Sequence, residues 1–249
     1  MPPGLCYVEE MSAAWLNPAW KPASSGETVV LIHGALVDGW EMLLLRWRLK
    51  QLGYRTLQFR YRSMTRGIDE NAALLSEFLR QTEGDTLHVI GHSMGGVLVR
   101  QVFEQTSDPR PGRLIAIGSP LLDVWIGHRI NAMHSLGHHL IGKTVFDHIH
   151  RQNNPVWQGT RDFGVIAGTY PMGIGRIFAD LPPGSDGTIL WDETRLQGLR
   201  DHVTINLNHF SMLFSRRCTA FIARFLATGQ FTDETPHALE TRETVAHLI

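Results

Sequence analysis

Short apolar runs alternate along the chain with segments whose apolar residues recur at helical spacing. The runs are rich in β-branched side chains and are bounded by glycine, proline or polar residues, which is typical of strands buried on both faces. Such an alternation predicts a mostly parallel sheet with helices on both faces. We expect about six strands, near residues 28–32, 54–61, 87–90, 114–117, 163–168 and 202–206.

The segments between these runs predict the helices. Residues 40–52 have helical spacing and are followed by Gly53, a typical C-terminal stop. Residues 69–81 combine an acidic first turn with an apolar face. Two further helices are expected, one from the end of the third strand to about residue 105 and one over residues 211–227.

A chain of 249 residues is ample for one core and marginal for two. It contains no repeat and no low-complexity linker, so we predict a single α/β domain over residues 1–249. Residues 1–27 are assigned to an N-terminal segment. Residues 228–249 form a polar C-terminal tail, which we expect to be frayed or loosely docked.

About forty residues between the fourth and fifth strands fit no strand. This insertion, residues 121–160, carries many apolar side chains and would leave from the carboxyl edge of the sheet, where ligands bind in such folds. It is longer than a crossover needs. We therefore expect a small helical cap that lines a pocket, the alternative being an ordinary crossover helix.

Composition and charge narrow the function class. The chain is 43% apolar and 19% charged, with a net charge of −1, so we expect no partnership with nucleic acid. No stretch reaches the ~18 apolar residues of a membrane span. The N-terminus has no apolar leader segment, and Cys6 and Cys218 are expected to be free thiols rather than a disulfide. We expect a cytoplasmic protein without an integral membrane span.

The segment Gly91-His92-Ser93-Met94-Gly95 directly follows the third predicted strand and precedes a predicted helix. A Gly-x-Ser-x-Gly motif in this context is typical of a nucleophile elbow, a sharp turn that exposes a serine at the end of a sheet. Glycine on either side lets neighbouring backbone approach the turn. Ser93 is therefore the candidate nucleophile.

A serine hydroxyl needs a base, and the base needs an orienting carboxylate. His209 follows the last predicted strand on a loop that can reach the elbow, whereas His202 lies within that strand. Asp186 lies in a turn-rich loop with Gly187 behind it. We favour His209 as base and Asp186 as its partner; the rival carboxylates are Asp192, Glu193 and Asp201.

An oxyanion needs two convergent backbone donors. We expect one to be the N–H of Met94, the residue after the nucleophile, and the other to be that of Ala35, in the loop after the first strand. Leu36 is the fallback for Ala35. His33 is expected to hold this loop by hydrogen bonding.

Histidines in the insertion and arginines near the end of the second predicted strand form two further clusters. Six histidines lie in the insertion, and His134 and His138 are four residues apart, but no acidic residue or cysteine joins them at ligand spacing. We therefore expect no metal and no cofactor. Arg60, Arg62 and Arg66 could meet an acidic group of a substrate, although a solvated surface explains them as well.

Four blocks of the sequence, His33-Gly34, Gly91–Gly96, Ser185–Thr188 and Asn208-His209, together resemble the signature blocks of the α/β-hydrolase superfamily, in particular bacterial lipases and related esterases. The resemblance covers residues 28–227. It departs at the N-terminus, where the first strands of a full eight-stranded sheet are not evident, and in the insertion, which is shorter than many lipase lids. It implies a triad of Ser93, Asp186 and His209 without a metal.

These residues predict a serine hydrolase that cleaves a small-molecule or lipid carboxylic ester through an acyl-enzyme. Acyl transfer and thioester hydrolysis use the same triad and remain alternatives, as does a non-catalytic hydrolase fold, although such a fold would usually have lost the serine or the histidine. The acyl group, the alcohol and the oligomeric state are left open.

Overall fold

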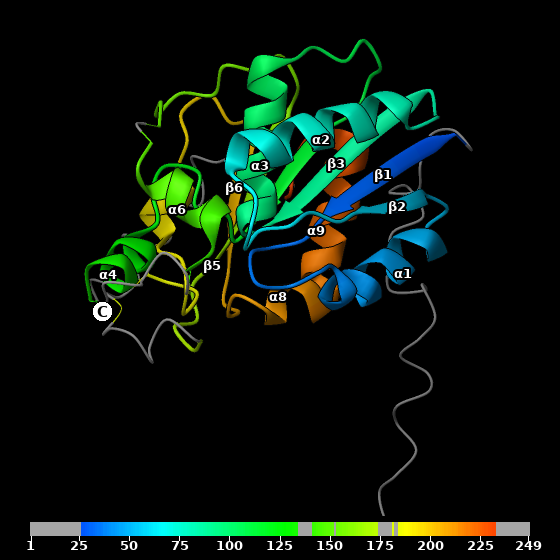
Figure 1. Ribbon diagram of the computed structural model, residues 1–249. Coiled ribbons are helices and arrows are strands. Elements are labelled where there is room, and N and C mark those ends of the chain that lie inside the picture. Colours follow the sequence, from blue (N-terminus) through cyan, green and yellow to red (C-terminus); the bar gives the residue numbers. More distant parts are fainter. Residues whose placement is uncertain (1–25, 134–140, 152, 174–180, 182–183, 233–249) are drawn as a thin grey trace, which may run out of the picture.

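A computed structural model describes residues 26–133, 141–151, 153–173, 181 and 184–232. Its centre is a six-stranded, wholly parallel sheet in the order β2-β1-β3-β4-β5-β6 (Figure 1). The predicted fold class and the number of strands are therefore confirmed. The strands are β1 (Glu27–Ile32), β2 (Arg55–Phe59), β3 (Thr86–His92), β4 (Leu114–Ile117), β5 (Phe163–Gly168) and β6 (Asp201–Ile205).

Helices cover both faces of this sheet. Strand residues alternate between them: Val30 and Ile32 of β1 face one layer, and Val29 and Leu31 face the other. On one side lie α2 (Ile68–Gln81) and α3 (Met94–Gln105); on the other lie α1 (Leu43–Gln51), α8 (Ser211–Phe214) and α9 (Arg216–Thr228). None of the described helices is long and apolar enough to cross a bilayer.

The chain order reverses at β1, because β2 pairs on one side of it and β3 on the other. In parallel sheets a crevice opens at the carboxyl ends of the strands where the order reverses. Ile32 pairs with Gly91 in register, so the loops that follow β1 and β3 begin side by side. Both loops carry predicted site residues.

The insertion contains two described helices, α4 (Trp125–Met133) and α6 (Lys143–Ile149), beside the carboxyl edge (Figure 1). They form the expected small helical cap. Residues 134–140 and 152 of the insertion lie outside the described residues, and so do His134 and His138.

Three boundaries differ from the sequence prediction. The first helix begins as a single 3₁₀ turn, Trp40–Met42, before α1. The closing helix is divided at Ser215, which is extended and accepts a hydrogen bond from the Cys218 N–H, so it caps a new helix. A second 3₁₀ turn spans Trp191–Thr194.

The chain ends are described in part. Residues 1–25 and 233–249, and with them Cys6, lie outside the described residues, whereas Cys218 is a buried free thiol. The residues directly after α9 do not fit the expectation of a loosely docked tail. Phe231 is buried and its ring stacks on that of Phe225 at 4.5 Å between centroids.

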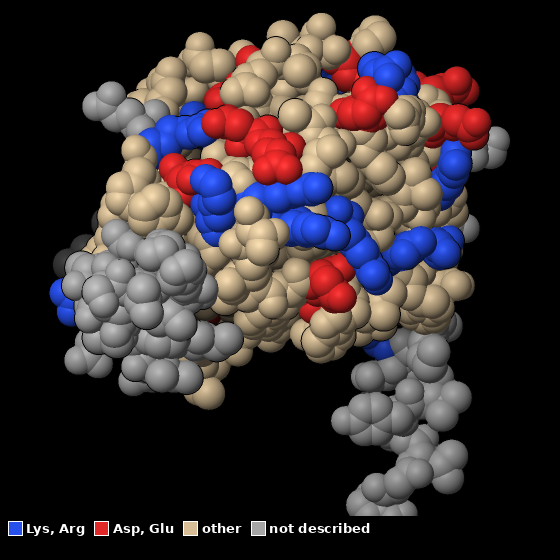
Figure 2. Space-filling model, in the orientation of Figure 1, with Lys and Arg blue, Asp and Glu red and all other residues tan. Residues whose placement is uncertain are grey.

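Charged side chains gather unevenly on the face shown in Figure 2, where basic groups form a row along the segment from β2 to α2. Arg60 and Arg62 in this segment are exposed. Arg66 pairs with Glu70 in the first turn of α2, at 2.8 Å. The row therefore follows one loop and does not extend over a sheet face.

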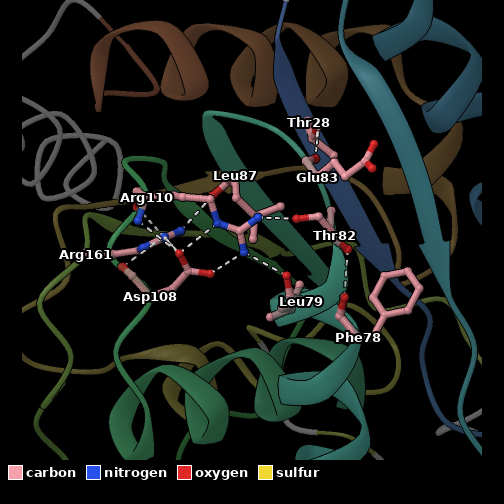
Figure 3. Close-up of polar contacts among 9 residues, drawn as sticks. All are labelled: Thr28, Phe78, Leu79, Thr82, Glu83, Leu87, Asp108, Arg110 and Arg161. Atoms are coloured by element: carbon pink, nitrogen blue, oxygen red, sulfur yellow. Dashed lines mark hydrogen bonds and ion pairs between the residues drawn. The ribbon is translucent and has the colours of Figure 1, made fainter.

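The amino edge of the sheet is held by two arginines (Figure 3). Arg110 binds the Asp108 carboxylate and donates to the carbonyls of Leu79 and Thr82 at the end of α2. Arg161 donates to the carbonyl of Leu87 at 2.7 Å and to that of Arg110. Two cations thus donate to backbone carbonyls at the end of α2 and at the amino end of β3.

Candidate active site

Ser93 occupies the tight turn between β3 and α3. Its backbone is at φ 52° and ψ −126°, a region that a non-glycine residue rarely adopts and that costs about 1–3 kcal/mol. Its N–H donates to the Ile117 carbonyl at 2.9 Å, which fixes the turn against β4. The strain and the anchor together hold the side chain at the carboxyl edge of the sheet.

Two glycines allow this turn. A Cβ atom on Gly91 would clash with the backbone of Gly95 and Gly96, and one on Gly95 would clash with the carbonyls of Ile32 and His33. The second clash shows how closely the turn approaches the end of β1. Glycine is therefore required two residues before and two residues after Ser93 because a side chain there would collide with neighbouring backbone, as the sequence indicated.

His209 and Asp186 form a buried pair next to this turn. The His209 Nδ1 atom is 2.7 Å from the Asp186 Oδ2 atom, and the His209 N–H donates to the Asp186 carbonyl at 2.9 Å. The two residues are 4% and 1% exposed. Because a carboxylate accepts, Nδ1 carries the proton, and Nε2 is left as the acceptor nitrogen.

The loop around Asp186 holds its carboxylate in place. The Oδ1 atom accepts hydrogen bonds from the N–H groups of Thr188, at 2.9 Å, and Ile189, at 2.7 Å. The second oxygen is therefore available to His209. Among the rival carboxylates, Asp192 is exposed, and Asp201 accepts from the Phe231 N–H at the start of β6.

His92, next to Ser93, links the turn to His209. Its Nε2 atom lies 3.1 Å from the His209 carbonyl, and the two imidazole rings are 4.7 Å apart. Burial is the main cause that lowers the pKa of His92 well below its ordinary value, so the ring is neutral and donates to this carbonyl. This contact was not predicted, since the position of His92 in the motif does not reveal a partner 117 residues away.

The loop after β1 supplies the candidate second oxyanion donor. The N–H of Leu36, the fallback, donates to the buried Ser63 Oγ at 3.1 Å, whereas that of Ala35 has no acceptor among the described residues. Leu36 has a positive φ of 64°. The Leu36 N–H is therefore already engaged by Ser63, and this hydrogen bond stabilises the strained loop.

The segment that contains Ser63 also supports the cap. The N–H groups of Lys143 and Thr144, at the start of α6, donate to the carbonyls of Met64 and Ser63, each at 3.1 Å. One short segment therefore contacts both the loop after β1 and the cap. Nothing in the local sequence around Ser63 distinguishes it from a loop serine.

His33 holds the base of the same loop, as expected. Its Nδ1 atom lies 2.7 Å from the Gly34 carbonyl, and its Nε2 atom accepts from the Tyr61 N–H at 3.1 Å. Burial lowers the pKa of His33, which is consistent with a neutral ring that donates through one nitrogen and accepts through the other.

Ser93 and His209 line one cavity of about 350 Å³, which also receives Ala35 and Met94. The walls are otherwise mostly apolar, with side chains from the cap and from the loop of Asp186. The structure therefore brings all five predicted site residues to one place. The remaining lining residues include Val124, Ile126, Ile130, Ile141, Val145, Ile189 and Phe210.

Glu193 ties the cap to the loop of Asp186. Its buried carboxylate accepts from the N–H groups of Trp125, at the start of α4, and of Leu190, and its carbonyl accepts from the Leu122 N–H. Burial raises the pKa of Glu193 to about 7. This link to the cap was not predicted, because Trp125 is 68 residues away from Glu193 in the chain.

Three further histidines of the described residues form structural contacts. The His202 Nε2 atom lies 2.9 Å from Thr194 Oγ1, and the His148 Nε2 atom lies 2.9 Å from the Pro120 carbonyl oxygen. The exposed His128 pairs with Asp123. Within the part of the chain that the structure describes, no three His, Cys, Asp or Glu side chains gather as metal ligands would.

Comparison with known sequences places the chain in a family. The model for the family described as "Alpha/beta hydrolase family" matches residues 29–244. No curated protein sequence matches the chain.

Solved structures with the same fold include three enzymes. A mature lipase of Bacillus licheniformis has 16% identity and a TM-score of 0.61, over 82% of this chain and 92% of its own. An esterase of Pyrococcus furiosus has 15% identity and a TM-score of 0.57, over 82% of each chain. A carboxyl esterase of metagenomic origin has 16% identity and a TM-score of 0.56, over 77% of this chain and 67% of its own. At such identities the likeness is one of fold.

Proposed function

The chain belongs to the alpha/beta hydrolase family, and we propose that it is a serine hydrolase that cleaves carboxylic esters. The observation that carries this proposal is the short contact between His209 Nδ1 and Asp186 Oδ2, at 2.7 Å, beside a strained serine in the same apolar cavity. A base that is oriented by a buried carboxylate next to a projecting hydroxyl is the arrangement that acyl transfer requires.

In the proposed reaction the Ser93 oxygen attacks the ester carbonyl while His209 Nε2 takes its proton. Asp186 keeps the proton on Nδ1 and stabilises the imidazolium that forms. The tetrahedral oxyanion receives hydrogen bonds from the N–H groups of Ala35 and Met94. Met94 is the first residue of α3, so the positive end of the helix dipole also faces this charge.

Collapse of the intermediate expels the alcohol, which receives the proton from His209. Water then attacks the acyl-serine with His209 again as base, and the released acid restores the free hydroxyl. The lining of the cavity supports an uncharged, apolar acyl group. Val124 and Ile130 on the cap side and Ile189 in the loop of Asp186 would contact this acyl group.

The test is a series of 4-nitrophenyl esters of increasing acyl length, assayed with the wild type and with Ser93→Ala. We expect kcat to fall by about 10⁴ or more in the variant, since it lacks the nucleophile. A fluorophosphonate probe should label the wild type on Ser93 and leave the variant unlabelled. Undiminished turnover by Ser93→Ala would overturn the proposal.

A further inference from the structure

A second hollow lies beside the apolar cavity. It is a groove of about 650 Å³ between the loop after β1 and the loop after β2. Leu36 and Val37 line both the groove and the cavity that contains Ser93. An ester bound at Ser93 can therefore extend in two directions, into the cavity under the cap and past Leu36 into the groove.

The groove combines apolar and charged walls. Three of its residues are large apolar side chains that remain unusually exposed: Leu36 at 60%, Trp40 at 61% and Met64 at 43%. Grouped exposure of this kind is typical of a binding surface. The cap cavity is enclosed by aliphatic groups, whereas this groove is open and suits an amphiphilic group.

The charged groups of the groove are unpaired. Arg62 lines it, and the exposed Arg60 lies two residues earlier in the same segment. Neither guanidinium forms an ion pair or a side-chain hydrogen bond within the described residues, and neither does the carboxylate of Asp38, which also lines the groove. Arg66, by contrast, is already paired with Glu70. The lining of the groove therefore carries one unpaired cation, Arg62, and one unpaired anion, Asp38, and Arg60 adds a second unpaired cation in the same segment, next to the lining residue Tyr61.

We propose that this groove binds the alcohol half of the substrate ester and that this alcohol carries an acidic group, which pairs with Arg62. The apolar part of the alcohol would lie on Leu36, Trp40 and Met64. The inference depends on the proposed ester hydrolysis, because the groove leads to Ser93. It assigns the two halves of the ester to different surfaces, the acyl chain to the cap and the alcohol to the two loops.

The test compares two monomeric esters that share a hexanoyl group. 2-Nitrophenyl hexanoate has a neutral leaving group, and 3-hexanoyloxy-4-nitrobenzoate has the same nitrophenol with an added carboxylate. The ratio of their kcat/KM values, anionic over neutral, is measured for each variant. Intrinsic reactivity cancels when these ratios are compared between variants.

We expect Arg62→Gln to lower this ratio about threefold, which is the typical effect of losing one exposed ion pair. Asp38→Asn should raise the ratio by a similar factor. Lys50→Gln, which removes an exposed cation from α1, is the matched control and should leave the ratio unchanged. High salt should reduce the difference between wild type and Arg62→Gln, because it screens exposed charges.

Equal ratios in wild type, Arg62→Gln and Asp38→Asn would overturn the inference, and so would a shift of the same size in Lys50→Gln. Turnover of the neutral ester by all four proteins would at the same time uphold the proposed hydrolysis. Failure of every variant and of the wild type on both esters would contradict the proposed function itself.

Discussion

The two edges of the sheet satisfy their backbone groups in opposite ways. At the amino edge, Arg110 and Arg161 donate to backbone carbonyls of the end of α2, of β3 and of the loop before β4 (Figure 3). At the carboxyl edge, the Ala35 N–H has no acceptor among the described residues, and Ser93 is held in a strained conformation. The same parallel sheet therefore has one closed end and one that keeps donors free.

The contrast separates the groups that stabilise the fold from those that are available for a reaction. Buried polar groups with partners stabilise a fold, whereas unsatisfied or strained groups destabilise it and are found at sites of function. The Arg161 guanidinium is only 8% exposed and lies 4.8 Å above the ring of Phe103. We expect changes at the amino edge to alter stability alone, and changes at the carboxyl edge to alter turnover.

The largest effect is expected at the carboxyl edge, from Asp186→Asn. An amide can still accept from Thr188 and Ile189 through its oxygen, but it then presents an NH₂ group to His209 Nδ1. His209 would shift its proton to Nε2 and could no longer accept one from Ser93. We expect kcat to fall about 10⁴-fold, measured with a nitrophenyl ester, while Asp192→Asn serves as control. A loss below tenfold would remove Asp186 from the mechanism.

The amino edge supplies the contrasting variant, Arg161→Met. It leaves the buried carbonyls of Leu87 and Arg110 without this donor, and we expect the free energy of unfolding to fall by about 3 kcal/mol. Urea denaturation measures the change. The kcat of the folded protein should stay within about twofold of wild type. The exposed Arg217→Met is the control, and a large loss of kcat in Arg161→Met would break the separation of the two edges.

A smaller effect concerns the cap, through His148. Burial lowers the pKa of His148 to about 4, below the ordinary 6.5, so the unfolded chain binds a proton in acid that the folded chain excludes. This contribution to stability is complete above the unfolded pKa and is lost as the pH falls toward 4. Between about pH 7.5 and pH 5 the loss is about 2 kcal/mol.

His148→Gln keeps a donor for the Pro120 carbonyl and cannot titrate. Urea denaturation at both pH values should therefore show a weaker pH dependence in this variant than in wild type. His150→Gln, at an exposed position, should retain the wild-type dependence. Equal dependence in all three proteins would exclude His148 as the titrating group.

The smallest effect is expected from Ser63→Ala, which frees the Leu36 N–H and loosens the oxyanion loop. Loss of an oxyanion donor costs about 10²–10³ in kcat; because Ser63 acts indirectly, we expect about tenfold, with KM nearly unchanged. Affinity for a boronic acid, which forms a tetrahedral adduct, should fall in parallel, and Ser63→Thr should restore both. Thr65→Ala is the control. A change confined to KM would contradict a positioning role.

Much of the fold could be predicted from the sequence because its determinants are local. Parallel strands that are buried on both faces must be short apolar runs, and Gly91 avoids a clash with the backbone of Gly95 and Gly96, which are close to it in the chain. The predicted site residues lie together because the topology brings the carboxyl ends of the strands to one edge. The division of the closing helix at Ser215 was missed, since a capping serine inside an amphipathic pattern reads as a helical residue.

The supports of the site could not be predicted, because each joins distant segments. Ser63 and Leu36 are 27 residues apart, and Glu193 and Trp125 are 68 apart. His92 contacts His209 across 117 residues. No periodicity or motif encodes such pairs, and a short polar side chain in a loop looks the same whether it contacts solvent or a strained backbone.

The shared anchor at Ser63 and Met64 limits how this enzyme can be rebuilt. The cap helix α6 and the loop after β1 are held by adjacent residues of one segment. A foreign cap grafted in place of residues 121–160 would therefore have to offer two backbone donors at the positions of Lys143 and Thr144. A graft without them would release the segment that positions Leu36. The part of the chain expected to set selectivity and the part expected to set turnover are therefore coupled, and replacing the cap would also alter the loop after β1.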